Sequence, residues 1–277
     1  MSYDILVLNP GSTSTKAAVY RDERPLMSRS VIHSNQDLAP YPALNDQLDY
    51  RVGMVRSWLA LEGYELSQVS AVVGRGGIIP NIVSGGYQVN EELADCLLHH
   101  TVFDHASNLG GLMAREFAQP LQVPAYIYDA VTSDELLPEA RVTGFKEVTR
   151  TSFCHVLNAR ATGHKYAQAM GRRYEDMNLV VAHLGGGISV SAHCHGRIID
   201  SVSDDAGPFS PDRGGSLNML YVLEMCYSGK YTKAEMMKKM RGEGGMSALL
   251  GTHDCQEVER RIAKGDEWAA LVYQAQA

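Results

Sequence analysis

Short apolar runs alternate with stretches of helical apolar spacing along the first half of the chain. Strands are predicted at 4–8 and 15–20, and the residues between them, Asn9 to Ser14 (NPGSTS), are all turn formers. The two strands are therefore predicted to form a hairpin. Apolar positions at helical spacing predict a helix over 43–61. The pattern continues with a strand at 70–74, helices at 91–100 and 107–118, and a strand at 123–129. This alternation is typical of an α/β fold.

The pattern begins again near residue 151. A helical stretch at 151–172 leads to a strand at 178–184, a glycine tip, and strands at 188–193 and 197–202. Aligning Gly11 with Gly185 superposes the two strand–tip–strand units. We therefore predict an internal duplication, with one domain over 1–150 and a second over 151–277.

The two hairpin tips are candidates for phosphate binding. Glycine, serine and threonine allow close approach of the backbone and offer N–H and O–H donors in an anion-binding nest. The alternative is that both tips are ordinary tight turns, because such residues are common in turns for local reasons. Finding two tips at matched positions favours the phosphate interpretation.

Composition and charge narrow the classes of partner. The chain has 277 residues, 45% of them hydrophobic and 21% charged, which is ordinary for a globular protein. Its net charge of −7, without a basic run, argues against nucleic acid as a partner. No apolar run reaches the ~20 residues of a membrane span. Five scattered cysteines, none in a C-x-x-C pair, favour a reducing cytoplasm.

Three residues are candidates for chemistry. Arg75 lies within Gly74-Arg75-Gly76-Gly77 directly after a strand, a poor place for packing and a good one for holding an oxyanion. Arg213 lies in PFSPDRGGSL, also on a loop. Asp129 ends an apolar strand, at the edge of a sheet where ligands usually bind, although it could instead cap the next turn.

The standard nucleotide and hydrolase motifs are absent from the sequence, since it contains no G-x-x-x-x-G-K-[ST], G-x-G-x-x-G or G-x-S-x-G. His193 and His195 flank Cys194 and could resemble a metal site, but no second ligand cluster accompanies them. A nucleotide hypothesis must therefore rest on the hairpins.

Taken together, six segments resemble the butyrate kinase branch of the acetokinase family. They are NPGSTSTKAAVY at 9–20, VVGRGG at 72–77, YD at 128–129, SFCHVLNARA at 152–161, AHLGGGISV at 182–190 and FSPDRGG at 209–215. The resemblance implies duplicated actin-like, ribonuclease H-like domains around a nucleotide cleft. It also implies reversible phosphorylation of a short-chain carboxylate by ATP and Mg²⁺ to an acyl phosphate, with butyrate as the expected substrate.

The resemblance also assigns roles to individual residues. The catalytic residues would be Asp129 as the active-site aspartate, His155 and Arg213 as groups stabilising the transferring phosphoryl, and Arg75 near the substrate. Asn9 would help place Mg²⁺. Nucleotide contacts would come from the two tips and their flanking residues: Asn9, Gly11, Ser12, Thr13, Ser14, Lys16, His183, Gly185, Gly186 and Gly187. Arg75 departs from the acetate kinase pattern, which has its substrate arginine at the position of Val72, and this shift favours butyrate over acetate.

The resemblance further implies that family members continue beyond the point where this chain stops, within a helix predicted from about 266. The second domain is therefore expected to be incomplete, and the complete protein to be a homo-oligomer. Two alternatives remain open: acetate or propionate as the substrate, and a truncated remnant without activity.

Overall fold

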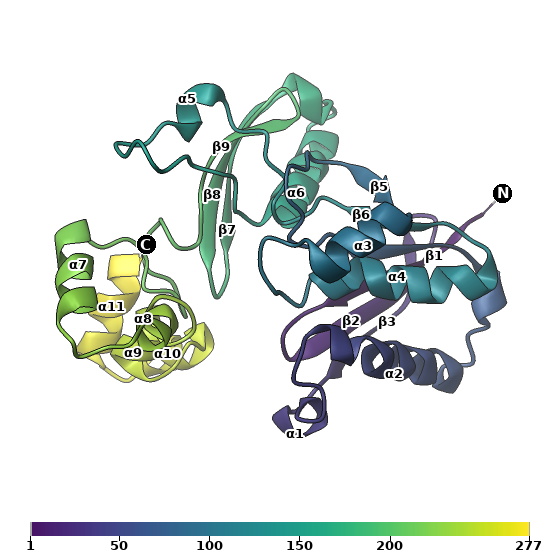
Figure 1. Ribbon diagram of the computed structural model, residues 1–277. Coiled ribbons are helices and arrows are strands. Elements are labelled where there is room, and N and C mark those ends of the chain that lie inside the picture. The colour runs from purple at the N-terminus through teal and green to yellow at the C-terminus, as the bar shows by residue number, and fades with distance from the viewer. Residues whose placement is uncertain (1, 277) are drawn as a thin grey trace. The chain divides into compact units, whose positions relative to one another are not determined.

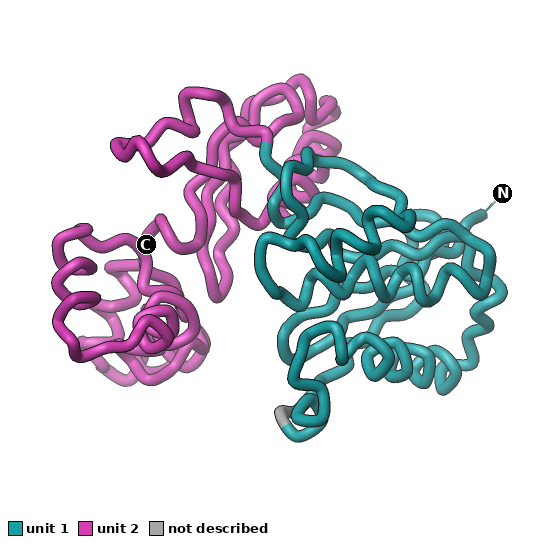
Figure 2. The backbone as a smooth tube through the Cα atoms, viewed as in Figure 1, with its two compact units in different colours: residues 1–134 teal, residues 135–277 magenta. Residues whose placement is uncertain are grey.

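The computed structural model describes residues 2–276, which form two compact units, residues 1–134 and 135–277 (Figure 2). This division falls earlier than the domain boundary expected at residue 150. The reason is that the segment after residue 134 bonds to the second unit's sheet: Leu137 N–H donates to the Ile199 carbonyl, and Arg150 pairs with Asp200.

The first unit is built on a six-stranded sheet in the order β3-β2-β1-β4-β6-β5 (Figure 1). Strands β1, β2 and β3 form an antiparallel meander, whereas β4 and β6 run parallel to β1, and β5 pairs antiparallel with β6. The bounds are β1 Asp4–Pro10, β2 Ser14–Arg21, β3 Arg24–Ile32, β4 Val69–Arg75, β5 Gly86–Gln88 and β6 Ala125–Tyr128.

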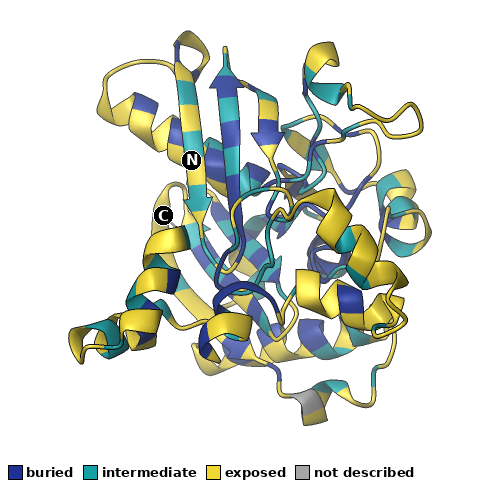
Figure 3. Ribbon diagram, turned by 90° about the vertical axis from the view of Figure 1, so that its left-hand side faces the viewer, coloured by how far each residue is buried: buried dark blue, intermediate teal, exposed yellow. Residues whose placement is uncertain are grey.

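Apolar faces of α2 Leu48–Leu61, α3 Glu91–His99 and α4 Asn108–Leu121 contribute to the core of this unit. The unit also contains the short helix α1 Asn35–Leu38 and 3₁₀ turns at Asn45–Gln47 and Leu66–Gln68. Buried and less buried positions alternate along β1, as a strand with one face on the core requires. Figure 3 shows such alternation of burial along strands and helices of the chain. Leu6, Leu8 and Ile127 of the sheet belong to one core cluster with Leu109 and Met113 of α4.

Helix α4 packs against β4 at backbone distance. A Cβ placed on Gly74 would lie 2.0 Å from the Gly110 carbonyl oxygen, and one placed on Gly110 would lie 2.3 Å from the Arg75 carbonyl oxygen. No side chain fits between the two elements here. Glycine in both the strand and the helix is what allows this approach.

The second unit contains a three-stranded antiparallel sheet in the order β7-β8-β9, with β7 Asn178–Leu184, β8 Ile188–Cys194 and β9 Arg197–Val202. Helix α6, Val156–Ala169, lies against β7. The remaining elements are α5 Pro138–Arg141, a 3₁₀ turn at Tyr174–Asp176, α7 Met219–Tyr227, α8 Lys233–Met240, α9 Gly245–Leu250, α10 Cys255–Ala263 and α11 Glu267–Gln276.

The helix predicted over 151–172 is shorter at both ends. Residues 151–155 are not helical, because the His155 backbone has left the helical region (φ −78°, ψ 59°). The helix ends at Ala169, and Gly171 follows with a positive φ of 64°. His155 therefore lies at the N-terminal end of α6 rather than within it.

The predicted duplication is confirmed by the strand pattern. Each unit has an antiparallel three-stranded meander whose first two strands are joined by a three-residue tip, 11–13 in the first and 185–187 in the second. In each tip the leading glycine N–H donates to a nearby carbonyl, Gly11 to Ser14 and Gly185 to Gly187. Between residues 2 and 276, no helix combines the length and apolarity needed to cross a bilayer.

Candidate functional site

In the first unit, three candidate residues gather at one edge of the sheet. Strands β1, β4 and β6 are parallel, so their carboxyl ends lie at the same edge. Asn9 is near the end of β1, Arg75 is the last residue of β4, and Asp129 directly follows β6. This is the position at which open α/β sheets bind their ligands.

Arg75 is half-buried on a rigid backbone. Its guanidinium has no hydrogen-bond or ion-pair partner among residues 2–276, and burial lowers its pKa. A Cβ on the following Gly76 would lie 2.5 Å from the Cα of Ala130, so the backbone segments that directly follow β4 and β6 are in contact. A cation held this way is suited to binding an anion, since no carboxylate of the described chain neutralises it.

Asp129 is 2% exposed and adopts a left-handed backbone conformation with φ of 42°. Its N–H donates to the Gly85 carbonyl at 3.0 Å, and its Oδ1 accepts from the Gly85 N–H at 2.9 Å. A non-glycine residue in this region is uncommon and costs free energy unless the surroundings hold it. The bonds to Gly85 do so, and they fix the carboxylate at the sheet edge.

The first hairpin tip is supported by a residue that sequence analysis missed. Arg51 of α2 is 0% exposed, and its guanidinium donates to the carbonyls of Gly11, Ser12 and Ser14. Lys16, one of the predicted nucleotide contacts, is exposed on β2 opposite Asn9. The signal for Arg51 was its place on the apolar face of the predicted helix.

The second tip, Gly185 to Gly187, is held by the loop that follows β9. The Gly186 carbonyl accepts from the Asp212 N–H at 3.1 Å and from Ser210 Oγ at 2.5 Å. A Cβ on Gly187 would lie 2.7 Å from Asp204 Oδ2. Two carboxylates therefore border this tip, and neither was among the predicted site residues.

Arg213 bridges these two carboxylates. Its Nη1 lies 2.6 Å from Asp212 Oδ1, and its Nε lies 3.4 Å from Asp204 Oδ2. Burial, together with the neighbouring charge of Asp205, raises the pKa of Asp204 despite the opposing effect of Arg213. Asp205 in turn pairs with Arg241. The run Asp204-Asp205 in the sequence was the available signal for this network.

His155 and His183 form a stacked pair, with ring centroids 3.7 Å apart and planes 7° from parallel. His155 Nδ1 shares a hydrogen bond with Ser189 Oγ at 2.8 Å, and Asn158 Nδ2 lies 2.9 Å from His183 Nδ1. An amide nitrogen only donates, so this bond assigns the proton of neutral His183 to Nε2. Burial lowers the pKa of His183, which favours that neutral form.

His193 serves the core of the second unit. It is buried between Tyr174, whose hydroxyl lies 2.5 Å from Nδ1, and Ser191, whose Oγ lies 2.7 Å from Nε2. Burial lowers the pKa of His193 to about 4. Within the described range 2–276, no group of three or more His, Cys, Asp or Glu side chains is arranged to hold a metal ion.

Comparison with known proteins decides the family. A model of the Acetokinase family matches residues 126–276, more than half of the chain. A protein of Listeria monocytogenes named as a probable butyrate kinase is 44% identical over 279 residues, covering 100% of this chain and 79% of that protein. The chain belongs to the acetokinase family. A second relative, named as probable butyrate kinase 2 of Caldanaerobacter subterraneus, is 45% identical over 276 residues, covering 99% of this chain and 78% of that protein.

Solved structures of other acetokinases share the fold. Acetate kinase of Porphyromonas gingivalis superposes with a TM-score of 0.78 at 18% identity, covering 99% of this chain and 76% of that one. A propionate kinase of Francisella tularensis gives 0.73 at 18% identity, with 99% and 77% covered. The predicted duplicated actin-like α/β fold is thus confirmed, as is the prediction of a phosphotransferase of the carboxylate kinase type. ATP and a divalent metal are the cosubstrate and cofactor that the family implies.

Proposed function

We propose that this acetokinase phosphorylates a short-chain carboxylate, with butyrate preferred, using ATP and Mg²⁺. The observation that carries the proposal is Arg75, a cation without a partner among residues 2–276, fixed by glycines at the sheet edge that also holds Asp129. The names of the two relatives at 44% and 45% identity support butyrate as the substrate. The proposal includes a role for each of the individual site residues.

In the first unit, Arg75 binds the carboxylate of the substrate. A carboxylic acid with a pKa near 4 to 5 is already ionised at pH 7, so no general base is needed to activate it. Asp129 then serves to orient groups or to organise the metal, not to accept a proton. The carboxylate oxygen attacks the γ-phosphorus, forming an O–P bond as the bond to the ADP oxygen breaks and ADP leaves with the electron pair.

Asn9 and Asp129 fit a magnesium ion in the type of donor they offer. Both carry hard oxygen donors at the same edge of the sheet, and no side-chain hydrogen bond occupies Asn9 within the described chain. Magnesium is usually held by one or two protein oxygens together with waters and phosphates, so a dense cluster of ligands is not required. When bound, the ion would offset the charge of the phosphates.

In the second unit, His183, His155 and Arg213 stabilise the transferring phosphoryl group. His183 offers a neutral N–H donor at Nε2, beside Gly185, where a Cβ would lie 2.9 Å from that nitrogen. Arg213 supplies a guanidinium held in place by two carboxylates. Such donors act by positioning and charge stabilisation, which is the main demand of phosphoryl transfer.

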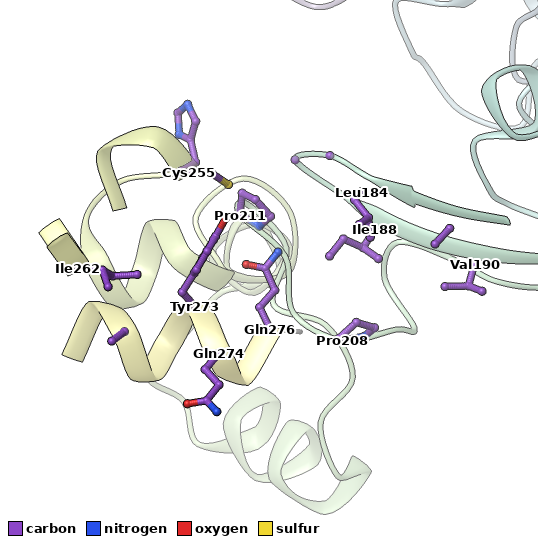
Figure 4. A pocket seen from close by; sticks show the side chains of 15 residues that line it. Leu184, Ile188, Val190, Pro208, Pro211, Cys255, Ile262, Tyr273, Gln274 and Gln276 are labelled. Carbon is purple, nitrogen blue, oxygen red and sulfur yellow. The ribbon is translucent and has the colours of Figure 1, made fainter. Parts of the chain in front are cut away.

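A cavity of about 990 Å³ adjoins the second tip and suits the nucleoside of ATP. Gly185 and Gly186 border it, and its walls are largely apolar, with Leu184 and Ile188 from the sheet and Tyr273 from α11 (Figure 4). Pockets of this kind, apolar with a few polar groups, are usual for small ligands. Gln274 and Gln276 provide amides at the cavity wall for hydrogen bonds to a base or ribose.

A hydroxamate assay with ATP, Mg²⁺ and a series of carboxylates tests the proposal. Two extra methylenes buried in an apolar pocket are worth roughly 0.8 kcal/mol each, so butyrate should exceed acetate about 15-fold in kcat/KM. Equal or better kcat/KM with acetate would instead identify an acetate kinase. Absence of hydroxamate with every acid tested would support the inactive alternative.

A further inference from the structure

The first hairpin tip rests on a buried positive charge. Arg51 is the largest fully buried side chain of the first unit, and arginine is rarely buried in this way without a charged partner. No carboxylate pairs with it among residues 2–276. Burial lowers the pKa of the guanidinium, yet arginine remains protonated in proteins. The fold therefore tolerates an uncompensated cation directly behind the tip.

Neutral oxygens satisfy this cation. Nη1 donates to the Gly11 carbonyl at 2.9 Å and to Thr15 Oγ1 at 3.0 Å, and Nη2 donates to the Ser12 carbonyl at 3.2 Å. Gln47, one helical turn away, accepts at Oε1 from Nη2 at 2.8 Å and from Nε at 3.1 Å. The planar fork of arginine is what reaches these acceptors at once.

These bonds orient the peptide groups of the tip. Arg51 engages the carbonyls of Gly11, Ser12 and Ser14, and the remaining one, of Thr13, accepts from the His33 N–H at 2.9 Å. Every carbonyl of residues 11–14 thus has a donor from within the unit. Ser12 and Thr13 are exposed, and their backbone N–H groups have no backbone partner within the described residues.

We propose that Arg51 is a positioning residue for phosphate: it turns the carbonyls of the tip inward, leaves the N–H groups of Ser12 and Thr13 for the ligand, and adds its own positive charge behind them. The inference rests on the proposed function, because it assumes that the first tip contacts the polyphosphate of ATP. A carbonyl facing a phosphate would repel it, whereas an N–H backed by a cation attracts it.

The substitution Gln47→Glu separates charge from structure. It is nearly isosteric and places a carboxylate on the guanidinium, so it neutralises the charge of Arg51 while keeping the bonds that hold the tip. We expect it to weaken binding of inorganic tripolyphosphate and to raise the KM for ATP about tenfold. The KM for butyrate should stay within about twofold, and the unfolding midpoint should not fall.

Arg51→Lys tests the other half of the inference, because lysine keeps the charge but cannot reach several carbonyls in one plane. It should also raise the tripolyphosphate Kd. Arg56→Gln is the matched control: it removes one positive charge from the same helix, where Arg56 is exposed and donates to the Glu116 carbonyl. Calorimetric titration of the full chain with tripolyphosphate and Mg²⁺ should give an unchanged Kd for this control.

Two results would overturn the inference. One is a tripolyphosphate Kd within about twofold of the wild-type value in both Gln47→Glu and Arg51→Lys. The other is a KM for butyrate that rises as much as the KM for ATP, which indicates a general structural role. If the wild-type chain binds tripolyphosphate but forms no acyl phosphate, the proposed reaction fails while the Arg51 comparison stays valid. If it forms acyl phosphate but binds no tripolyphosphate, the inference about Arg51 fails while the proposed reaction stands.

Discussion

Replacing Arg213 by alanine should affect catalysis and stability together, because the same guanidinium faces the proposed phosphoryl group and bridges two carboxylates. Arginines that stabilise a transferring phosphoryl are worth about 10³ to 10⁵ in rate. We therefore expect Arg213→Ala to lower kcat at least about 10³-fold and to raise KM much less. Arg213→Lys should recover little, since the planar fork is lost.

The stability cost follows from the burial of the ion pairs. Removing one partner of a buried pair costs about 3–5 kcal/mol, and breaking an exposed pair about 0–1 kcal/mol. The side chains of Arg213 and Asp204 are 24% and 11% exposed, which places this network between the two limits. We expect the free energy of unfolding to fall by about 2–3 kcal/mol at pH 7.5.

The pH dependence of this cost has a definite sign. Burial and Asp205 already raise the pKa of Asp204, and loss of Arg213 will raise it further. An acid with a raised folded pKa binds a proton in the folded state that the unfolded state releases, so folding gains stability as pH falls. The destabilisation by Arg213→Ala should therefore be largest at pH 7.5 and smaller at pH 5.5.

Hydroxamate kinetics and urea unfolding at these two pH values measure both effects. Arg150→Ala is the control, because its pair with Asp200 lies in the same unit but is 41% and 51% exposed. It should keep a normal kcat and lose about 1 kcal/mol or less. A kcat for Arg213→Ala within about tenfold of the wild-type value would show that Arg213 is structural and does not act on the phosphoryl group.

Two further predictions concern stability. The pKa of His193 is lowered from 6.5 to about 4, so the folded state resists protonation of this side chain. The free energy of unfolding should therefore drop by about 2 kcal/mol between pH 7.5 and pH 5, and urea titrations of His193→Gln should not show this loss. An equal drop in that variant would assign the loss to other groups. Gly74→Ala should destabilise by about 1–3 kcal/mol, because its Cβ would lie 2.0 Å from the Gly110 carbonyl oxygen. Gly53→Ala on α2, where nothing lies within 4 Å of the added Cβ, should instead stabilise the protein by about 0.5–1 kcal/mol. A Gly74→Ala protein as stable as the wild type would mean that β4 and α4 can separate.

Local patterns in the sequence were sufficient for the hairpin tips and for most of the strands, but they did not predict β3 or β5. Turn formers between apolar runs define the tips at 11–13 and 185–187, and the order of strands and helices follows from their periodicity. Asp129 could also be placed, since a polar residue after a buried strand marks a sheet edge. These features depend on neighbours in sequence, which is why one sequence suffices to predict them.

The supports of the tips could not be predicted in the same way. Arg51 contacts residues up to 40 positions away in the sequence. The ion pair between Asp204 and Arg213 depends on how the loop after β9 folds. The sequence shows that Arg51 lies beside Val52 and Val55 on the apolar face of a helix. It does not show which carbonyl groups accept hydrogen bonds from Arg51. The start of α6 was missed for a related reason: Cys154 packs with Val156 and Ile198 in a small core, and the helix begins only after that contact.

The backbone contacts around Arg75 limit how the proposed substrate edge can adapt. Gly74 packs against Gly110 on one side of Arg75, and Gly76 packs against Ala130 on the other. The end of β4 therefore cannot shift unless α4 and the start of the segment after β6 move with it. Accommodating a longer or shorter acyl chain by movement of this edge would therefore disturb the whole first unit. Selectivity between acids must be set by the size of the surrounding side chains, so it should change by single substitutions and not by loop insertions.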